Sequence, residues 1–252
     1  MLRLQPCTLK ILKRVEELSG RSVQFMRDEK LQVLSTLQIA RNGAEFHVLR
    51  YQPSDKPLDY LVAYQAAFAL RMFENPADQR FDFNKTEFAT IGVTNLITAG
   101  QALNASDMEG VSQFAELVTH WALMNLRSLP IGMRIDRWLA DEYPELQSQQ
   151  LASHLVQQQQ NMNALTLSHG KLTVPVTLLS TIAAYALFSD QLAGVSRYAI
   201  PFEAAGVVED GRHLLTLLDK LPKQSSDDRK LVEHWADACG MNGWFNWTIY
   251  QP

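Results

Sequence analysis

The stretch "DYLVAYQAAFALRMFEN", residues 59–75, constrains the fold more than any other part of the chain. Every residue from Tyr60 to Leu70 is apolar or aromatic except Gln65. A helix that is apolar on all sides is normally enclosed by the rest of its domain. We therefore predict a buried central helix. An unpaired buried amide costs about 1–3 kcal/mol, so we expect the Gln65 amide to be hydrogen-bonded inside the protein or to line a cavity.

The segments before this helix predict one helix and a small antiparallel sheet. Residues 8–19 carry Leu9, Leu12, Val15 and Leu18 at helical spacing, with Gly20 as the stop signal. "RSVQFMRDE" is typical of a short strand. In "VLSTLQIARNGAEFHVLRY", Asn42-Gly43 separates two strand-like runs and predicts a hairpin, because both residues tolerate the positive φ of a type I′ turn. The loop "QPSDKP" then leads to the buried helix, with Pro57 suited to its first turn.

The rest of the chain predicts helices almost throughout. We expect them at roughly residues 84–103, 107–128, 132–142, 145–165, 174–192, 203–221 and 226–239, with breaks at Asn104, Pro130, Gly170, Pro201 and Pro222. The Gln-rich stretch "QSQQLASHLVQQQQN" has Leu151, Leu155 and Met162 at helical spacing. This pattern predicts an amphipathic helix whose glutamines form an uncharged solvated face.

Length and composition predict a single α+β domain that is predominantly helical. The chain has 252 residues and 46% hydrophobic content, enough for a sizeable core. We expect an α+β part at residues 1–104 and a helical part at 105–252. Neither a membrane span nor a signal peptide is predicted, which favours the cytoplasm. A net charge of -4 does not favour nucleic-acid binding, and the two cysteines, Cys7 and Cys239, are expected to be reduced thiols.

The order of short sheet with hairpin, proline-containing loop and buried helix resembles the layout of zincin metallopeptidases, especially the small ImmA/IrrE-like ones. In that family the helix carries His-Glu-x-x-His, because residues four apart on one face can both bind zinc while the Glu activates water. The matching positions here are Tyr64, Gln65 and Phe68, and Glu74 lies where some relatives carry a further acidic residue. The resemblance covers about 50 residues.

None of the three replacements supports the chemistry of that family. Phe68 has no lone pair for a metal, Tyr64 could bind one only as a phenolate, and the Gln65 amide cannot accept a proton as a carboxylate does. The resemblance therefore implies a pseudoenzyme with no metal and no cofactor at this helix. A core helix with one hydrogen-bonded Gln and no peptidase ancestry is the alternative, and it also predicts no metal hydrolysis there.

Two other stretches offer candidate partner-binding residues. In "RSLPIGMRIDRWLADEYPEL", Arg134 and Arg137 precede Trp138, and Trp and Arg are common at binding hot spots. The C-terminal "NGWFNWTIYQP" contributes Trp244 and Trp247. For each stretch, packing within the chain is the alternative to binding. Glu233, His234 and Asp237 also form a candidate metal-ligand set.

These observations predict a catalytically inactive, metallopeptidase-like protein that binds another protein as an interaction or regulatory subunit. The resemblance also implies a bacterial defence or mobile-element setting. Two alternatives stay open. One is an active, metal-dependent hydrolase with a dispersed site that includes Glu74 and His47. The other is a structural subunit of a larger complex.

Overall fold

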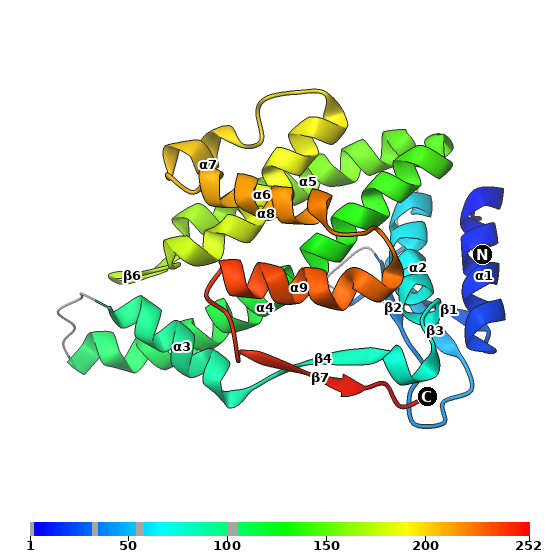
Figure 1. The fold of residues 1–252 in the computed structure, drawn as a ribbon, viewed down its shortest axis with the longest axis horizontal. Helices are drawn as coiled ribbons and strands as arrows, with labels where there is room; N and C mark the ends of the chain where they lie inside the picture. Colours follow the sequence, from blue (N-terminus) through cyan, green and yellow to red (C-terminus); the bar gives the residue numbers. More distant parts are fainter. Residues whose placement is uncertain (1–2, 32–34, 54–57, 100–104) are drawn as a thin grey trace. The chain divides into compact units, whose positions relative to one another are not determined.

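The computed structural model describes residues 3–31, 35–53, 58–99 and 105–252. The fold is α+β and predominantly helical, as predicted (Figure 1). The chain forms two compact units, and neither is one continuous segment. The first comprises Met1–Asp82, Arg134–Ser153 and Thr248–Pro252, and the second comprises Phe83–Met133 and His154–Trp247. The division expected at residue 104 falls inside the second unit.

The first unit contains a small sheet and two long helices. Its elements are α1 (Pro6–Ser19), β1 (Val23–Arg27), β2 (Ser35–Gln38), β3 (His47–Tyr51), α2 (Asp59–Phe73), the 3-10 turns η1 (Ala77–Gln79) and η2 (Pro144–Leu146), and the adjoining ends of α4 (Ala105–Glu142) and α5 (Gln147–Thr166). Helix α1 packs along α2 (Figure 1). The Asp59 carboxylate accepts the backbone N–H of Gln5 at 2.6 Å, which joins the two helix starts.

The predicted hairpin is present, but the sheet is mixed. Asn42 and Gly43 have φ values of 54° and 81°, as a type I′ turn requires, and β2 pairs antiparallel with β3. Strand β1 pairs with the other edge of β3 in parallel, giving the order β1-β3-β2. The parallel pairing corrects the expectation of a purely antiparallel sheet. Parallel strands cannot be joined by a tight turn, and here β2 and the hairpin loop lie between β1 and β3 in the chain, so the connection is long enough for this pairing.

Helix α2 is enclosed on most of its circumference but not on all of it. Its fully buried side includes Val62, Ala63 and Ala66, each with no exposed surface. A half-buried stripe runs along the opposite side, through Leu61, Tyr64, Gln65, Phe68 and Met72. Within the described part of the chain, no residue hydrogen-bonds to the Gln65 amide. Gln65 is thus tolerated because this stripe is only half-buried. This corrects the expectation of a helix buried on all sides, whose Gln65 amide would either be bonded inside the protein or line a cavity. Pro57 lies outside the described residues.

The second unit holds most of the helices. Its elements are α3 (Glu87–Thr98), most of α4 and α5, β5 (Ser168–His169), β6 (Leu172–Thr173), α6 (Val176–Ala193), α7 (Ile200–Ala204), α8 (Val208–Lys220), η3 (Ser225–Asp227) and α9 (Asp228–Ala238). Strands β5 and β6 were not predicted, and neither were β4 (Phe81–Lys85) and β7 (Phe245–Ile249), which pair with each other. Helix α8 packs along α6 (Figure 1). Gly211 permits this approach, since a Cβ there would lie 2.8 Å from the backbone nitrogen of Ala184.

Three helix predictions differ from the structure. The helix predicted at 203–221 is divided into α7 and α8, and Pro201, expected as a break, lies within α7. The break expected at Pro130 is absent, and α4 continues through it for 38 residues in all. Buried neighbours such as Leu126 and Met133 hold the helix on both sides of the proline, and tertiary packing can outweigh a local breaker. The helix predicted at 84–103 ends at Thr98. The end predicted for it and the break at Asn104 lie outside the described residues.

The Gln-rich helix α5 is formed, but its buried side is polar. Gln150, His154, Gln158 and Asn161 are each at most 5% exposed, whereas Leu155 and Met162 are 40% and 41% exposed. Ser189 of α6 explains this orientation. Its hydroxyl lies 2.8 Å from both His154 Nδ1 and Gln158 Nε2. The prediction that the glutamines of α5 form only a solvated face was therefore wrong for Gln150 and Gln158.

Helix α6 is the only described helix whose length and apolar composition would suffice to cross a membrane. About 67% of its residues are buried inside the protein, as is common for a core helix. Cys7 and Cys239 are both unbridged and buried. Burial raises the pKa of each thiol, so both remain protonated near neutral pH.

Candidate binding pocket beside Trp138

A pocket of about 230 Å³ opens in the first unit. Three helices line it: Arg14 comes from α1, Ile135 and Trp138 come from α4, and Ala67, Leu70, Arg71 and Glu74 come from α2 and the residue that follows it. The four residues on the α2 side recur at helical spacing, so they project from one face. The structure thus brings together two residues that sequence analysis had placed in different candidate sites, Glu74 and Trp138.

The charged side of the pocket is formed by Arg14 and Glu74. The Arg14 Nη2 donates to Glu74 Oε1 at 2.7 Å, with 54% and 29% of the two side chains exposed. Such a partly exposed ion pair contributes at most about 1 kcal/mol to stability. A guanidinium has five N–H donors, and the other donors of Arg14 meet no acceptor among the described residues. Arg14 therefore has hydrogen-bonding capacity left at the pocket.

The apolar side of the pocket is formed by Trp138 with Leu70, Ala67 and Ile135. The Trp138 ring makes an edge contact with Tyr143, with ring centroids 5.1 Å apart at an angle of 76°. Leu70, Ala67 and Ile135 are each at most 3% exposed, so they form a fixed floor. Trp138 itself is only half-buried. The pocket thus combines a rigid apolar floor with an aromatic wall that a ligand can reach.

A buried polar network fixes the segment of α4 that carries Trp138. Asp136 is fully buried, and its Oδ1 accepts the Tyr60 hydroxyl at 2.6 Å and the Gln150 amide at 3.0 Å. The same Gln150 amide donates to the backbone carbonyl of Asp136 at 2.8 Å. Hydrogen bonds to a charged acceptor are the stronger kind. This network joins α2, α4 and α5, and Asp136 follows the pocket residue Ile135 in the chain.

The residues at the expected motif positions do not line this pocket. Tyr64 and Phe68 pack edge to face, with ring centroids 5.2 Å apart at 76°. Gln65 projects from the side of α2 roughly opposite the pocket, given about 100° of rotation per residue. Burial, and secondarily the charge of Asp136, raise the pKa of Tyr64 well above its usual value. Its phenol therefore stays neutral and is a poor metal ligand, so these positions do not fit a zinc ion.

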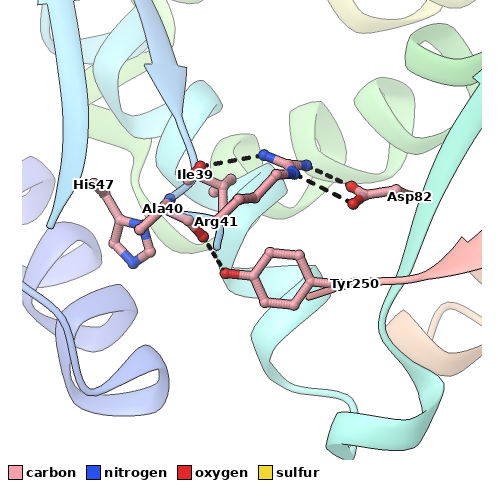
Figure 2. A network of polar contacts seen from close by, with 6 residues as sticks. All are labelled: Ile39, Ala40, Arg41, His47, Asp82 and Tyr250. Atoms are coloured by element: carbon pink, nitrogen blue, oxygen red, sulfur yellow. Dashed lines mark hydrogen bonds and ion pairs between the residues drawn. The ribbon is translucent and has the colours of Figure 1, made fainter. Parts of the chain in front are cut away.

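His47, a member of the alternative dispersed site, is held by hydrogen bonds at both ring nitrogens. Its Nδ1 accepts the backbone N–H of Ala40 at 3.0 Å, and its Nε2 lies 2.9 Å from the Ser19 hydroxyl. Figure 2 shows the first of these contacts within a larger network. His47 has no exposed surface. It cannot reach a substrate proton without breaking these bonds.

The same network anchors the C-terminal tail on the hairpin (Figure 2). Arg41 binds Asp82 through both Nε and Nη2, with the Nε–Oδ2 distance 3.2 Å. Bonding to Asp82 raises the pKa of Arg41. The hydroxyl of Tyr250 donates to the carbonyl of Ala40, and the N–H of Gly43 donates to the carbonyl of Pro252 at 3.1 Å. The Asn42-Gly43 turn thus positions the tail as well as the hairpin.

The remaining candidate residues are less accessible than the sequence suggests. Arg134 is 5% exposed and Trp244 is 6% exposed, whereas Arg137 and Trp247 are half-buried. Trp247 contacts Phe83 and Phe245 in an aromatic cluster of the second unit. Neither C-terminal tryptophan is among the residues that line the pocket.

The proposed ligand set on α9 does not form. Glu233 pairs with Arg229 at 2.8 Å, and Asp237 accepts the Asn242 amide at 2.7 Å. In the ranges that the structure describes, no three His, Cys, Asp or Glu side chains are placed to bind one metal ion.

Arg14 and Arg71 are charged pocket residues that were not predicted from the sequence, and Arg14 shows why. The apolar stripe of α1 was expected along Leu9, Leu12, Val15 and Leu18. The structure instead buries Cys7, Thr8, Ile11, Leu12 and Val15, and leaves Leu9 and Leu18 exposed. A charged residue beside this rotated stripe has no distinctive local pattern. Only the packing of α1 on α2 places Arg14 next to Glu74.

Comparison of the chain with protein-family models, with curated proteins and with solved structures finds no match.

Proposed function

We propose that this protein acts by binding another protein, and that helix α2 carries no metal-dependent hydrolysis. The observation that carries the proposal is the state of the α2 positions where a metallopeptidase needs its ligands. Tyr64 is held neutral and packed against Phe68, and Gln65 has no carboxylate. A metal site needs ligand atoms with available lone pairs, and a general base must accept a proton. Neither requirement is met there.

The arrangement of the first unit supports a pseudo-metallopeptidase origin for this binding role. A small sheet with a hairpin precedes helix α2, which is the order that the ImmA/IrrE-like resemblance implies. Strand β2 packs against α2. With the ligand residues replaced, selection would act on binding surfaces of such a fold and not on hydrolysis. We further propose a cytoplasmic regulatory role in a bacterial defence or mobile-element system, in keeping with the same resemblance.

The pocket beside Trp138 is a candidate for the contact with the partner. It combines a half-buried Trp, a partly exposed Arg and a fixed apolar floor. Trp and Arg are the side chains most enriched at binding hot spots. In contrast, the dispersed hydrolase site is disfavoured, because Glu74 is paired with Arg14 and His47 is bonded at both ring nitrogens.

Site-specific photo-crosslinking in the native host tests this proposal. A photo-reactive residue replaces Lys10, which is exposed on α1 one turn before Arg14. We expect one discrete crosslinked protein. The matched control places the same group at Lys220, which is exposed on α8 of the second unit.

The crosslink should be absent from the Lys220 control and strongly reduced when Trp138→Leu is added to the Lys10 probe. Circular dichroism of the Trp138→Leu protein establishes that it is folded. A crosslink that Trp138→Leu leaves unchanged, or an identical pattern from both probe positions, would show that the pocket is not the binding site.

A further inference from the structure

The size of the pocket beside Trp138 limits what it can hold. At about 230 Å³ it is smaller than the roughly 300–1,000 Å³ of sites that enclose drug-sized ligands. Arg14 is 54% exposed at its rim, so the space is open to solvent. Such a pocket cannot bury most of a free small molecule, but it can accept one large side chain whose backbone stays outside. The geometry therefore favours an anchor residue of a polypeptide.

The walls of the pocket favour an aromatic anchor. The Trp138 ring offers an aromatic partner, and aromatic pairs gain about 0.5–1.5 kcal/mol beyond their buried area. Leu70 and Ile135 supply the apolar floor. Guanidinium groups also interact favourably with aromatic faces within about 6 Å, and Arg14 and Arg71 both line the pocket.

The charges of the pocket favour an acidic residue next to that anchor. The charged lining residues are two arginines and one glutamate. Glu74 accepts one hydrogen bond from Arg14, and its donor is Nη2. The remaining N–H groups of Arg14 can therefore bind a second carboxylate through charge-assisted hydrogen bonds. A basic neighbour of the anchor would instead be repelled.

We propose that this pocket binds a partner segment in which an aromatic residue is adjacent to Asp or Glu. The aromatic ring enters between Trp138 and the floor of Leu70 and Ile135, and the carboxylate binds Arg14 at the rim. This inference rests on the proposed binding function and specifies the chemistry of the partner.

The test uses the full chain labelled with fluorotryptophan, and the Trp138 signal is assigned by comparison with Trp138→Leu. The probes are the capped peptides Ala-Trp-Asp-Ala, Ala-Trp-Asn-Ala, Ala-Trp-Lys-Ala and Ala-Ala-Asp-Ala, together with free indole acetate. We expect Ala-Trp-Asp-Ala to shift the Trp138 fluorine resonance at millimolar concentration, as befits a single-side-chain contact. Ala-Trp-Asn-Ala should bind about tenfold more weakly, since it lacks the charged hydrogen bond to Arg14.

A second variant isolates the role of the charge. In Arg14→Gln, which alters a half-exposed side chain, the Asp and Asn peptides should bind equally. Equal binding of the Asp, Asn and Lys peptides to the unaltered protein would overturn the proposal. So would stronger binding of indole acetate than of the Asp peptide, which would identify a small-molecule site, or the absence of any Trp138 shift.

The two experiments fail in distinguishable ways. A crosslinked partner at Lys10 without peptide binding would reject the aromatic-acidic anchor and leave the binding function intact. Loss of both the crosslink and the peptide shift would reject the proposed function itself.

Discussion

His47 accepts a hydrogen bond at Nδ1 from the backbone N–H of Ala40, at 3.0 Å (Figure 2). Because Nδ1 is an acceptor, the ring is neutral and carries its proton on Nε2, toward Ser19. Protonation of Nδ1 would place its new N–H against the backbone N–H of Ala40, and neither donor would have an acceptor in this fully buried site. The hydrogen bond from Ala40, which lies just before the Asn42-Gly43 turn, therefore exists only while His47 is neutral.

This relationship predicts that the protein loses stability in mild acid. Burial, aided by the charge of Arg21 and opposed by that of Glu16, lowers the pKa of His47. The unfolded chain, with a His pKa of about 6.5, then binds a proton before the folded chain does. The stabilisation is complete above about pH 6.5 and is lost as the pH falls toward the folded pKa.

Urea denaturation between about pH 7.5 and pH 5.5 measures this effect. The free energy of unfolding should fall more steeply with acidification in the unaltered protein than in His47→Gln. His213→Gln is the control, because His213 is exposed. An equal slope in His47→Gln and the unaltered protein would exclude His47 as the source.

The hydrogen bond that anchors the C-terminal tail predicts that removing the Tyr250 hydroxyl lowers the free energy of unfolding. Tyr250→Phe keeps the ring contact with Phe73, whose centroid is 6.0 Å away, but removes the donor to the carbonyl of Ala40. We expect a loss of about 1–2 kcal/mol in the free energy of unfolding, because a buried acceptor is left without its bond. Tyr198→Phe removes a hydroxyl bonded in an exposed setting and should cost under about 0.5 kcal/mol. Equal values for both variants would contradict this account.

The close approach of α8 to α6 predicts that Gly211→Ala destabilises the protein, although helix propensity alone would predict stabilisation. Replacing a helical glycine by alanine normally stabilises a helix by about 1 kcal/mol. At Gly211 the added Cβ would lie 2.8 Å from the nitrogen of Ala184 and 2.9 Å from the carbonyl carbon of Ala183. Gly211→Ala should therefore lower the free energy of unfolding by about 1–3 kcal/mol. Thr216→Ala, on the exposed side of α8, should be near neutral. A stabilised Gly211→Ala would show that the helices are not packed this closely.

The half-buried stripe of α2 predicts different results for two substitutions of one residue. Gln65→Glu should lower stability at neutral pH by about 1 kcal/mol, because a carboxylate is partly desolvated there. Relative to the unaltered protein, the loss should shrink as the pH falls through the raised carboxyl pKa. Gln65→Leu should leave stability unchanged or higher, as no described residue bonds the amide. A strongly destabilised Gln65→Leu would mean that the amide has an essential partner.

Local chemistry made part of the fold predictable. Asn42 and Gly43 can both adopt positive φ, so these two residues were enough to predict the hairpin. The apolar run of α2 was equally clear. By contrast, the parallel pairing of β1 with β3 depends on residues more than twenty positions apart, and no local signal encodes it.

The orientation of helices was harder to predict than their existence. In α5, periodicity located the helix, but the serine that makes its buried side polar lies on α6. In α1, the apolar residues suggested one face and packing selected another. The pocket shares this difficulty, since Arg14, Glu74 and Trp138 come from three segments that only tertiary packing joins. Trp138 and Glu74 were identified as candidates, but their proximity was not.

The central claim is that the protein works by binding and not through a metal on α2. Its most direct test is the zinc content of the native protein, purified without chelators and measured by mass spectrometry alongside Tyr64→Phe and Gln65→Leu. The account predicts zinc well below one ion per chain in all three proteins. One zinc ion per chain in the native protein that is lost in Tyr64→Phe would contradict it.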